Sequence, residues 1–310
     1  MNRFILAAGL ALITLIMVVL VNSIQSSPTI DALYVFGDSL SDTGTVFRAT
    51  GGLYPPNPPY FQGRYSNGRV WVEYLADRLQ ISSKQLNNFA YGGATTAESA
   101  PHFSNGSSES SLAPGLLTQV QSILPTQVQI EPQALTIIWA GANDYLQGVS
   151  QATVPVANIT RAMEVLMAKG AKRFLVANLP DLGQLPAIRT SANSDRLSQL
   201  TQAHNQGLRR SLKQLHQQYR DIQIVTLDAN TLYREAITDP DAFGFTNVIN
   251  ACLTNSRSCG QPEQFLFWDG IHPTTTAHRF LGEAAFSEIQ AARMAHPPLA
   301  GSPAIDYQAS

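Results

Sequence analysis

Residues 32–44 read Ala-Leu-Tyr-Val-Phe-Gly-Asp-Ser-Leu-Ser-Asp-Thr-Gly, an apolar run that stops at a glycine and is followed by small polar residues. A short, nearly continuous apolar run is typical of a strand that is buried on both faces of a parallel sheet. The polar residues predict a sharp turn at 37–39 that opens a helix. This places Ser39 at the carboxyl edge of the sheet, where open α/β folds bind their ligands. Ser39 is then either a reactive hydroxyl beside free backbone N–H groups or an ordinary helix N-cap.

Apolar runs and stretches of helical spacing alternate along the rest of the chain. We expect further strands at 85–90, 134–140, 173–177 and 222–227. We expect helices at 70–79, 116–124, 156–168, from residue 194 onward, and at 273–292. This alternation predicts an α/β protein with five parallel strands in a three-layer α/β/α sandwich. The sequence contains no G-x-S-x-G run, which argues against a fold whose nucleophile lies on that elbow.

A long segment with few signals for regular structure follows the first strand. Residues 45–67 are rich in Gly, Pro, Tyr and Phe, and residues 54–61 read Tyr-Pro-Pro-Asn-Pro-Pro-Tyr-Phe. Proline excludes such a run from a helix interior or a central strand. We therefore expect a long loop beside Ser39, whose aromatic side chains either line an acyl or aryl pocket or pack on one another at the surface.

A second polar motif stands near the other end of the chain, where residues 268–274 read Trp-Asp-Gly-Ile-His-Pro-Thr. A serine hydroxyl is a weak nucleophile until a base removes its proton, and the base needs a carboxylate to orient it. One tight turn would bring the Asp269 carboxylate to the His272 imidazole, and Pro273 would then start the closing helix. Taken alone, Asp269 is better explained as a helix-capping residue and His272 as a loop histidine.

Two further segments make the pattern specific. Residues 87–96 read Asn-Asn-Phe-Ala-Tyr-Gly-Gly-Ala-Thr-Thr and residues 138–145 read Ile-Trp-Ala-Gly-Ala-Asn-Asp-Tyr, and both follow expected strands. Together with the first and last motifs, they resemble the four conserved blocks of the GDSL esterases and lipases, also called SGNH hydrolases. The resemblance covers residues 34–274, with the blocks in the family's order.

The resemblance implies a flavodoxin-like SGNH hydrolase fold and an activity. The activity is hydrolysis of carboxylic esters through an acyl-enzyme on Ser39, with His272 as the general base and Asp269 orienting it. No metal or organic cofactor is implied. Substrates in the family range over acylglycerols, phospholipids, aryl esters and acetylated sugars. The aromatic loop and the N-terminal segment favour a lipid or a short-chain acyl ester, with transient contact to a membrane or lipid surface.

The resemblance also implies three donors for the oxyanion of the tetrahedral intermediate. They are the backbone N–H groups of Ser39 and Gly93 and the side-chain amide of Asn143. Gly92 is the competing choice for the glycine. Outside the family pattern, Gly93 would be a turn glycine and Asn143 a capping or turn residue.

Two other functions are compatible with these motifs. The first is an exported lipid acyltransferase that uses the same triad to move the acyl group to an alcohol instead of water. The second is an inactive binding protein on the same scaffold, which the presence of all the family's site residues disfavours. The motifs do not set the physiological ester, its chain length or the oligomeric state.

The N-terminal segment predicts export. Residues 1–28 contain one positive charge, an apolar core and a polar stretch that ends in proline. This pattern resembles a secretory signal peptide or, because of its length, an N-terminal membrane anchor. We expect one hydrolase domain at 29–293, a flexible tail at 294–310, and a secreted or periplasmic location, outside the cytoplasm in either case.

Charge and cysteine content bear on three further features, namely a nucleic-acid partner, a disulfide and a zinc site. Charged residues make up 14% of the chain and the formal net charge is −2, so no basic patch suggests a nucleic-acid partner. Cys252 and Cys259 close a short loop, which in an exported protein predicts a disulfide rather than two free thiols. The sequence contains neither a second cysteine pair nor an H-E-x-x-H run, so it does not indicate a zinc site.

His204 lies in the apolar stripe of the longest expected helix and is expected in the core. Asp228 ends a strand and is the rival of Asp269 for the role of the triad acid.

Overall fold

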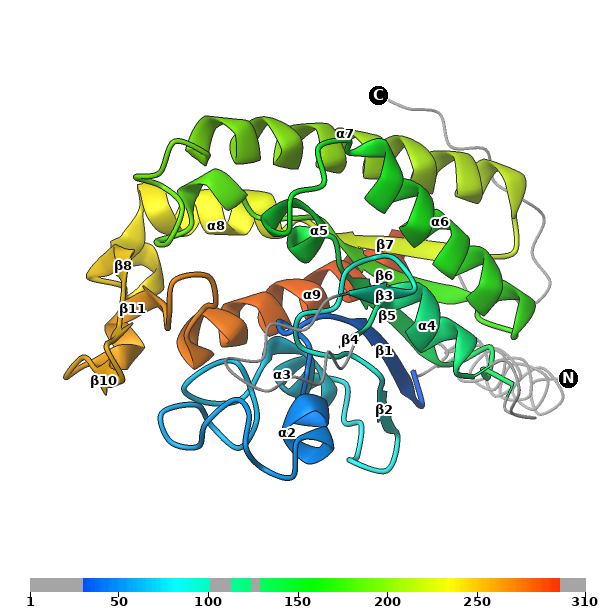
Figure 1. Ribbon diagram of the computed structural model, residues 1–310. Helices are drawn as coiled ribbons and strands as arrows, with labels where there is room; N and C mark the ends of the chain where they lie inside the picture. Colours follow the sequence, from blue (N-terminus) through cyan, green and yellow to red (C-terminus); the bar gives the residue numbers. More distant parts are fainter. Residues whose placement is uncertain (1–29, 101–112, 124–128, 296–310) are drawn as a thin grey trace, which may run out of the picture. The chain divides into compact units, whose positions relative to one another are not determined.

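The five predicted strands form one parallel sheet (Figure 1). The computed structural model describes residues 30–100, 113–123 and 129–295. Within residues 30–292 the strand order is β2-β1-β5-β6-β7, and every neighbouring pair is parallel. The strands are β1 Leu33–Gly37, β2 Leu86–Asn88, β5 Leu135–Trp139, β6 Arg173–Ala177 and β7 Gln223–Leu227. This order confirms the predicted flavodoxin-like α/β architecture.

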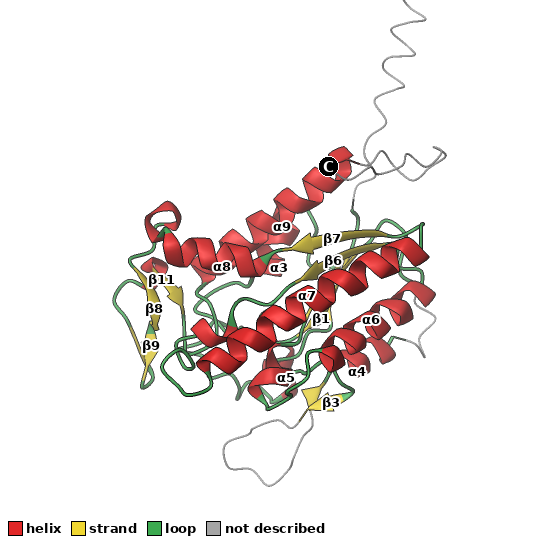
Figure 2. Cartoon of the chain, turned by 90° about the horizontal axis from the view of Figure 1, so that it is seen from above, coloured by secondary structure: helices red, strands yellow, loops and turns green. Residues whose placement is uncertain are grey.

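Helices cover both faces of the sheet, because its strands are apolar on both sides. Leu33 and Val35 of β1 belong to one core, and Tyr34 and Phe36 belong to the other. The first core is covered by α3 Trp71–Arg78, α8 Ala229–Thr238 and α9 Thr275–Ala295. The second is covered by α4 Leu116–Gln121, α6 Thr153–Ala168 and α7 Ser194–Gln218. Figure 2 shows the two groups of helices on opposite sides of the sheet, so the three-layer sandwich is confirmed.

The turn after β1 does not open a helix, which corrects the prediction. Residues 38–41 form a turn, and the next helix, α2 Thr45–Ala49, begins only after Asp42. The carboxylate of Asp42 accepts three backbone N–H groups at the start of α2, so it caps this helix from outside and fixes its first turn. Ser39 is therefore not a helix N-cap. The segment at 45–67 begins with this short helix, and residues 50–67 form the expected loop.

The closing helix also begins later than predicted. Pro273 does not start α9, because it forms a β-bridge with Phe267 of the preceding strand. The hydroxyl oxygen of Thr274 instead accepts the N–H of Ala277 at 3.3 Å, which caps the first turn of a helix that starts at Thr275.

A helix that the sequence pattern did not predict, α8, follows β7 directly. The Asp228 carboxylate caps it by accepting the N–H of Thr231 at 3.0 Å. The disulfide between Cys252 and Cys259 closes the hairpin of β9 Leu253–Thr254 and β10 Arg257–Ser258. The remaining elements are β3 Ser99–Ala100, β4 Ala113–Pro114, α5 Ala142–Leu146, η1 Leu182–Gln184, η2 Pro240–Phe243, β8 Asn247–Ala251, η3 Pro262–Gln264 and β11 Phe265–Phe267.

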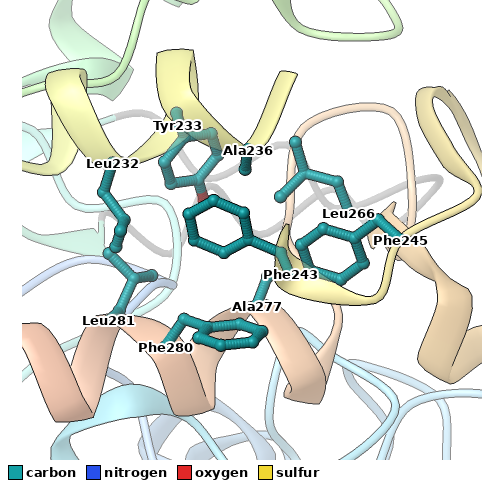
Figure 3. Close-up of a pocket in the computed structure, with 9 residues that line it drawn as sticks. All are labelled: Leu232, Tyr233, Ala236, Phe243, Phe245, Leu266, Ala277, Phe280 and Leu281. Atoms are coloured by element: carbon teal, nitrogen blue, oxygen red, sulfur yellow. The ribbon is translucent and has the colours of Figure 1, made fainter. Parts of the chain in front are cut away.

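A small apolar pocket lies between α8, η2 and α9 (Figure 3). Its lining consists of Leu232, Tyr233, Ala236, Phe243, Phe245, Leu266, Ala277, Phe280 and Leu281. The ring of Phe280 meets those of Phe243 and Phe245 edge to face, with centroids 5.0 and 6.0 Å apart. No lining residue is among the candidate catalytic residues, so this pocket belongs to the packing between α8, η2 and α9.

Some expectations concern residues outside the described part of the chain. The expected signal peptide or anchor at 1–28 lies there. The tail expected at 294–310 begins inside α9, which extends to Ala295, and lies outside the described residues from residue 296 onward. Within residues 30–100, 113–123 and 129–295, none of the helices combines the length and hydropathy of a transmembrane span.

Candidate active site

Ser39, His272 and Asp269 form a continuous chain of hydrogen bonds at the carboxyl edge of the sheet. Ser39 Oγ lies 2.8 Å from His272 Nε2, and His272 Nδ1 lies 2.7 Å from Asp269 Oδ2. The serine and the histidine are 7% and 8% exposed. A tight turn sets the second pair, since Asp269 Oδ1 also accepts the backbone N–H of His272 at 2.7 Å. In this geometry an imidazole can take the serine proton while the carboxylate fixes the imidazole tautomer.

Asp269 is held as a carboxylate by its hydrogen bonds. Burial alone raises its pKa, but the charge on His272 and hydrogen bonds from His272, Ile271 and Tyr60 lower the pKa to about 2. Tyr60 Oη donates to Oδ2 at 2.7 Å, the same oxygen that faces His272. The acid is therefore ionised at neutral pH.

The loop at 50–67 supplies aromatic side chains around this pair, a contact that the sequence did not assign to particular residues. The ring of Tyr65 lies 5.2 Å from that of His272, measured between centroids. Tyr60 and Tyr54 in turn pack edge to face against Tyr65, at 6.4 and 6.0 Å. The aromatic residues of this loop therefore pack on one another, and Tyr65 also borders His272.

Gly93 lies in the loop that follows β2. Hydrogen bonds connect this loop to the turn after β1 and to helix α5. Gly93 has a φ of +82°, and the space where a Cβ would stand is open. Gly92 differs, because its N–H donates to Asp42 Oδ2 at 2.9 Å and a Cβ there would lie 2.2 Å from Tyr65 Oη. Within the described part of the chain, no acceptor contacts the N–H of Gly93 or of Ser39. Of the two glycines, Gly93 is the one whose N–H can serve a ligand.

Asn143 stands in the first turn of α5, directly after β5. Its Nδ2 donates to the carbonyl of Ala94 at 2.9 Å, which leaves its second N–H for another acceptor. This bond ties Asn143 to the loop of Gly93. The three predicted donors thus follow the ends of β1, β2 and β5, which are neighbours in the sheet.

Three buried carboxylates flank the predicted residues and were not assigned from the sequence. They belong to Asp38, Asp42 and Asp144. Burial raises the pKa of Asp38 to about 7, although the N–H of Leu40 and the charge on His272 oppose this. The signal that could have found these residues is their position, since each lies within three residues of Ser39 or Asn143.

The other residues singled out from the sequence lie apart from this cluster. Asp228 accepts hydrogen bonds from Asn178 and from the start of α8, so Asp269 and not Asp228 is the acid beside His272. His204 is fully buried, as predicted, and lies 2.8 Å from the hydroxyl of Tyr145.

Comparison with known proteins identifies the family. The model of the GDSL-like lipase/acylhydrolase family matches residues 33–285, and the chain belongs to this family. It is 30% identical to the phosphatidylcholine-sterol acyltransferase of Aeromonas hydrophila, over 94% of this chain and 99% of that protein. It is also 30% identical to the secreted effector protein SseJ of Salmonella typhimurium, over 80% of this chain and 61% of that protein. Among solved structures, the carbohydrate acetylesterase Est24 of Sinorhizobium meliloti aligns with a TM-score of 0.49 and 14% identity, over 84% of this chain and 99% of that one. The protein is accordingly a hydrolase that acts on ester bonds, as predicted.

Proposed function

We propose that the protein hydrolyses lipid or short-chain acyl esters through an acyl-enzyme on Ser39. The observation that carries the proposal is the chain from Ser39 through His272 to Asp269, with contacts of 2.8 and 2.7 Å. His272 removes the Ser39 proton as Oγ attacks the ester carbonyl, and Asp269 holds the imidazole. His272 then gives this proton to the departing alcohol oxygen, and the acyl group stays on Ser39.

Deacylation uses the same groups. A water molecule gives its proton to His272 as its oxygen attacks the acyl carbonyl, and the proton returns to Ser39 when the acid leaves. In both steps the N–H groups of Ser39 and Gly93 and the amide of Asn143 stabilise the oxyanion, and losing one such donor typically costs about 2.7–4 kcal/mol. The choice of Gly93 is supported by its open surroundings, since the N–H of Gly92 is bonded to Asp42.

A lipid ester is the substrate that the surroundings of the site favour. Leu53 and Tyr54 are 79% and 45% exposed, and they belong to the loop whose Tyr65 borders His272. Exposed apolar side chains on this loop suit transient contact with a lipid surface. The relative from Aeromonas hydrophila, whose name gives phosphatidylcholine as the acyl donor, points to the same class of substrate.

Acyl transfer to an alcohol is the second candidate. It is favoured by the same relative, an acyltransferase that aligns over 99% of its length. Chemically the two reactions differ only in the acceptor that attacks the acyl-enzyme, so the site serves either one. We place the enzyme outside the cytoplasm, on the basis of the N-terminal segment, the disulfide and the secreted relative.

The test compares the wild type with Ser39→Ala on p-nitrophenyl esters from acetate to palmitate. The variant should lose about 10³-fold or more of the activity, because the attacking oxygen is gone. The chain-length optimum then separates an esterase from a lipase. Phosphatidylcholine vesicles with and without cholesterol separate hydrolysis, which releases free fatty acid, from transfer, which forms the sterol ester. Equal hydrolysis by wild type and variant would exclude Ser39 as the nucleophile.

A further inference from the structure

We propose that two buried carboxylates, those of Asp42 and Asp144, are positioning residues that hold the loop at 92–96 from both ends and thereby fix the N–H of Gly93. The inference rests on the proposed function, in which Gly93 is an oxyanion donor. Neither carboxylate touches the reacting atoms in this scheme, since both act through the backbone of the loop.

The first anchor joins the loop to the turn that carries Ser39. Asp42 Oδ2 accepts the N–H of Gly92 at 2.9 Å, while Oδ1 accepts the N–H of Gly44 at 2.8 Å. Asp42 is fully buried, so water does not compete for these bonds. Since Asp42 follows Ser39 by three residues, one carboxylate connects the proposed nucleophile to the residue before Gly93.

The second anchor joins the loop to the helix that carries Asn143. Asp144 Oδ2 accepts the N–H of Thr96 at 2.9 Å, and Oδ1 accepts the Thr96 hydroxyl at 2.6 Å. Asp144 is 3% exposed and Thr96 is 0% exposed. Asn158 Nδ2 donates to the same hydroxyl oxygen at 3.1 Å, so the hydroxyl is held on both sides.

Between these anchors, Gly93 keeps a positive φ, an N–H without an acceptor in the described chain, and open space on its Cβ side. Hydrogen bonds in a buried site are stronger than in water, which makes such anchors stiff. Each anchor also adjoins another proposed donor, Ser39 or Asn143, so the three donors are fixed relative to one another. Oxyanion stabilisation depends on donors that are in place before charge develops.

The test uses Thr96, whose hydroxyl bond to Asp144 can be removed at almost constant volume. Thr96→Val should lower kcat about 10- to 100-fold with KM changed by less than about threefold, because displaced donors act on the transition state. Thr96→Ser retains the hydroxyl and should keep kcat within about threefold of the wild type. Thr231→Val is the matched control, because Thr231 donates its N–H and its hydroxyl to Asp228 in the same pattern, at 3.0 and 2.9 Å.

A tetrahedral ligand gives a second readout. An alkyl boronic acid forms an adduct on a serine nucleophile, and its affinity should fall in Thr96→Val by about the factor lost in kcat. Asp42→Asn should behave in the same way, because one amide oxygen replaces two carboxylate oxygens and Gly92 faces an NH₂ group. Urea unfolding of every variant gives the folded fraction, so that kcat is expressed per folded molecule.

The possible outcomes distinguish a failure of the anchoring role from a failure of the proposed function. If Ser39→Ala is inactive while folded Thr96→Val and Asp42→Asn match the wild type in kcat, the anchoring role is wrong and the proposed function stands. If Thr96→Ser loses as much activity as Thr96→Val, the hydroxyl bond is not what positions the loop, and the inference is again wrong. If Ser39→Ala retains activity, the proposed function fails and this inference fails with it.

Discussion

The hydroxyl of Tyr60 donates to Asp269 Oδ2 at 2.7 Å, across 209 positions of sequence. The same oxygen faces His272 Nδ1, so a residue of the proline-rich loop helps to hold the carboxylate that orients the imidazole. The position of this loop is thereby coupled to the geometry of the proposed catalytic pair.

Tyr60→Phe tests this coupling by removing only the hydroxyl. A hydrogen bond to a charged group contributes about 1.5–3 kcal/mol, and part of it acts on the transition state, so we expect kcat/KM to fall about tenfold. The loss should appear in steady-state kinetics on p-nitrophenyl esters. An unchanged kcat/KM would mean that the remaining bonds to Asp269 orient it fully.

The same variant has a defined effect on stability. The folded pKa of Asp269 is about 2, below its ordinary value of 3.8, so its contribution to stability is present above pH 3.8 and is lost as the pH falls through about 2. Tyr60→Phe should raise this pKa and destabilise the protein most at neutral pH. In urea unfolding, the difference from the wild type should shrink as the pH is lowered from 4 toward 2.

Asn143→Ala should lower kcat by about 10²- to 10³-fold, which is the usual loss for one oxyanion donor. The control is Asn230→Ala, because Asn230 also donates its amide to a backbone carbonyl, at 3.0 Å compared with 2.9 Å for Asn143. Initial rates at saturating substrate provide the comparison. Equal small losses of kcat in both variants would mean that Asn143 has a structural role and is not an oxyanion donor.

Gly93→Ala and Gly244→Ala form a second matched pair. Both glycines have a positive φ, +82° and +71°, and both have open space where the new Cβ would stand. A non-glycine residue in this region costs about 1–2 kcal/mol, so the two variants should lose similar stability in thermal unfolding. Only Gly93→Ala places a methyl group in the proposed oxyanion loop, and only it should lose about tenfold or more in kcat/KM.

Asp38→Asn tests the buried carboxyl beside Ser39. Because burial raises the folded pKa of Asp38 to about 7, the protonated form favours the folded state below pH 3.8, and this contribution is lost as the pH rises through about 7. Asparagine keeps an oxygen for the N–H of Leu40 and does not ionise. Urea unfolding between pH 4 and pH 8 should show the variant gaining stability over the wild type, by on the order of 4 kcal/mol at most. Parallel curves would show that Asp38 ionises freely in the folded protein.

Much of the fold could be predicted because its decisive signals are local. The apolar runs of β1, β5 and β6 are nearly continuous, as is typical of a buried parallel strand. Helix α8 has ten residues and a narrow apolar stripe, and Asp228, which caps it, was interpreted as a strand end and as the rival of Asp269. The helix expected after Ser39 does not form, since Asp42 takes up the N–H groups at the start of α2 and delays that start to Thr45.

The candidate site could likewise be predicted only where its signals are local. The motifs were enough to predict that Ser39, His272 and Asp269 lie together, because each motif lies at the end of a strand or in a tight turn. The contact of Tyr60 with Asp269 depends on the path of an irregular loop, which no periodicity encodes. Similarly, the bond between Asp144 and Thr96 joins two motifs whose relative placement only the folded sheet defines.

Ser39 and His272 meet across 233 positions of sequence. A ribosome adds about 5–20 residues per second, so the serine is made about 10–50 seconds before the imidazole that activates it. During that interval the growing polypeptide contains Ser39 but not His272, and it cannot cleave an ester by the proposed mechanism. The proposed ester-cleaving site is thus completed only when synthesis of the domain is almost finished.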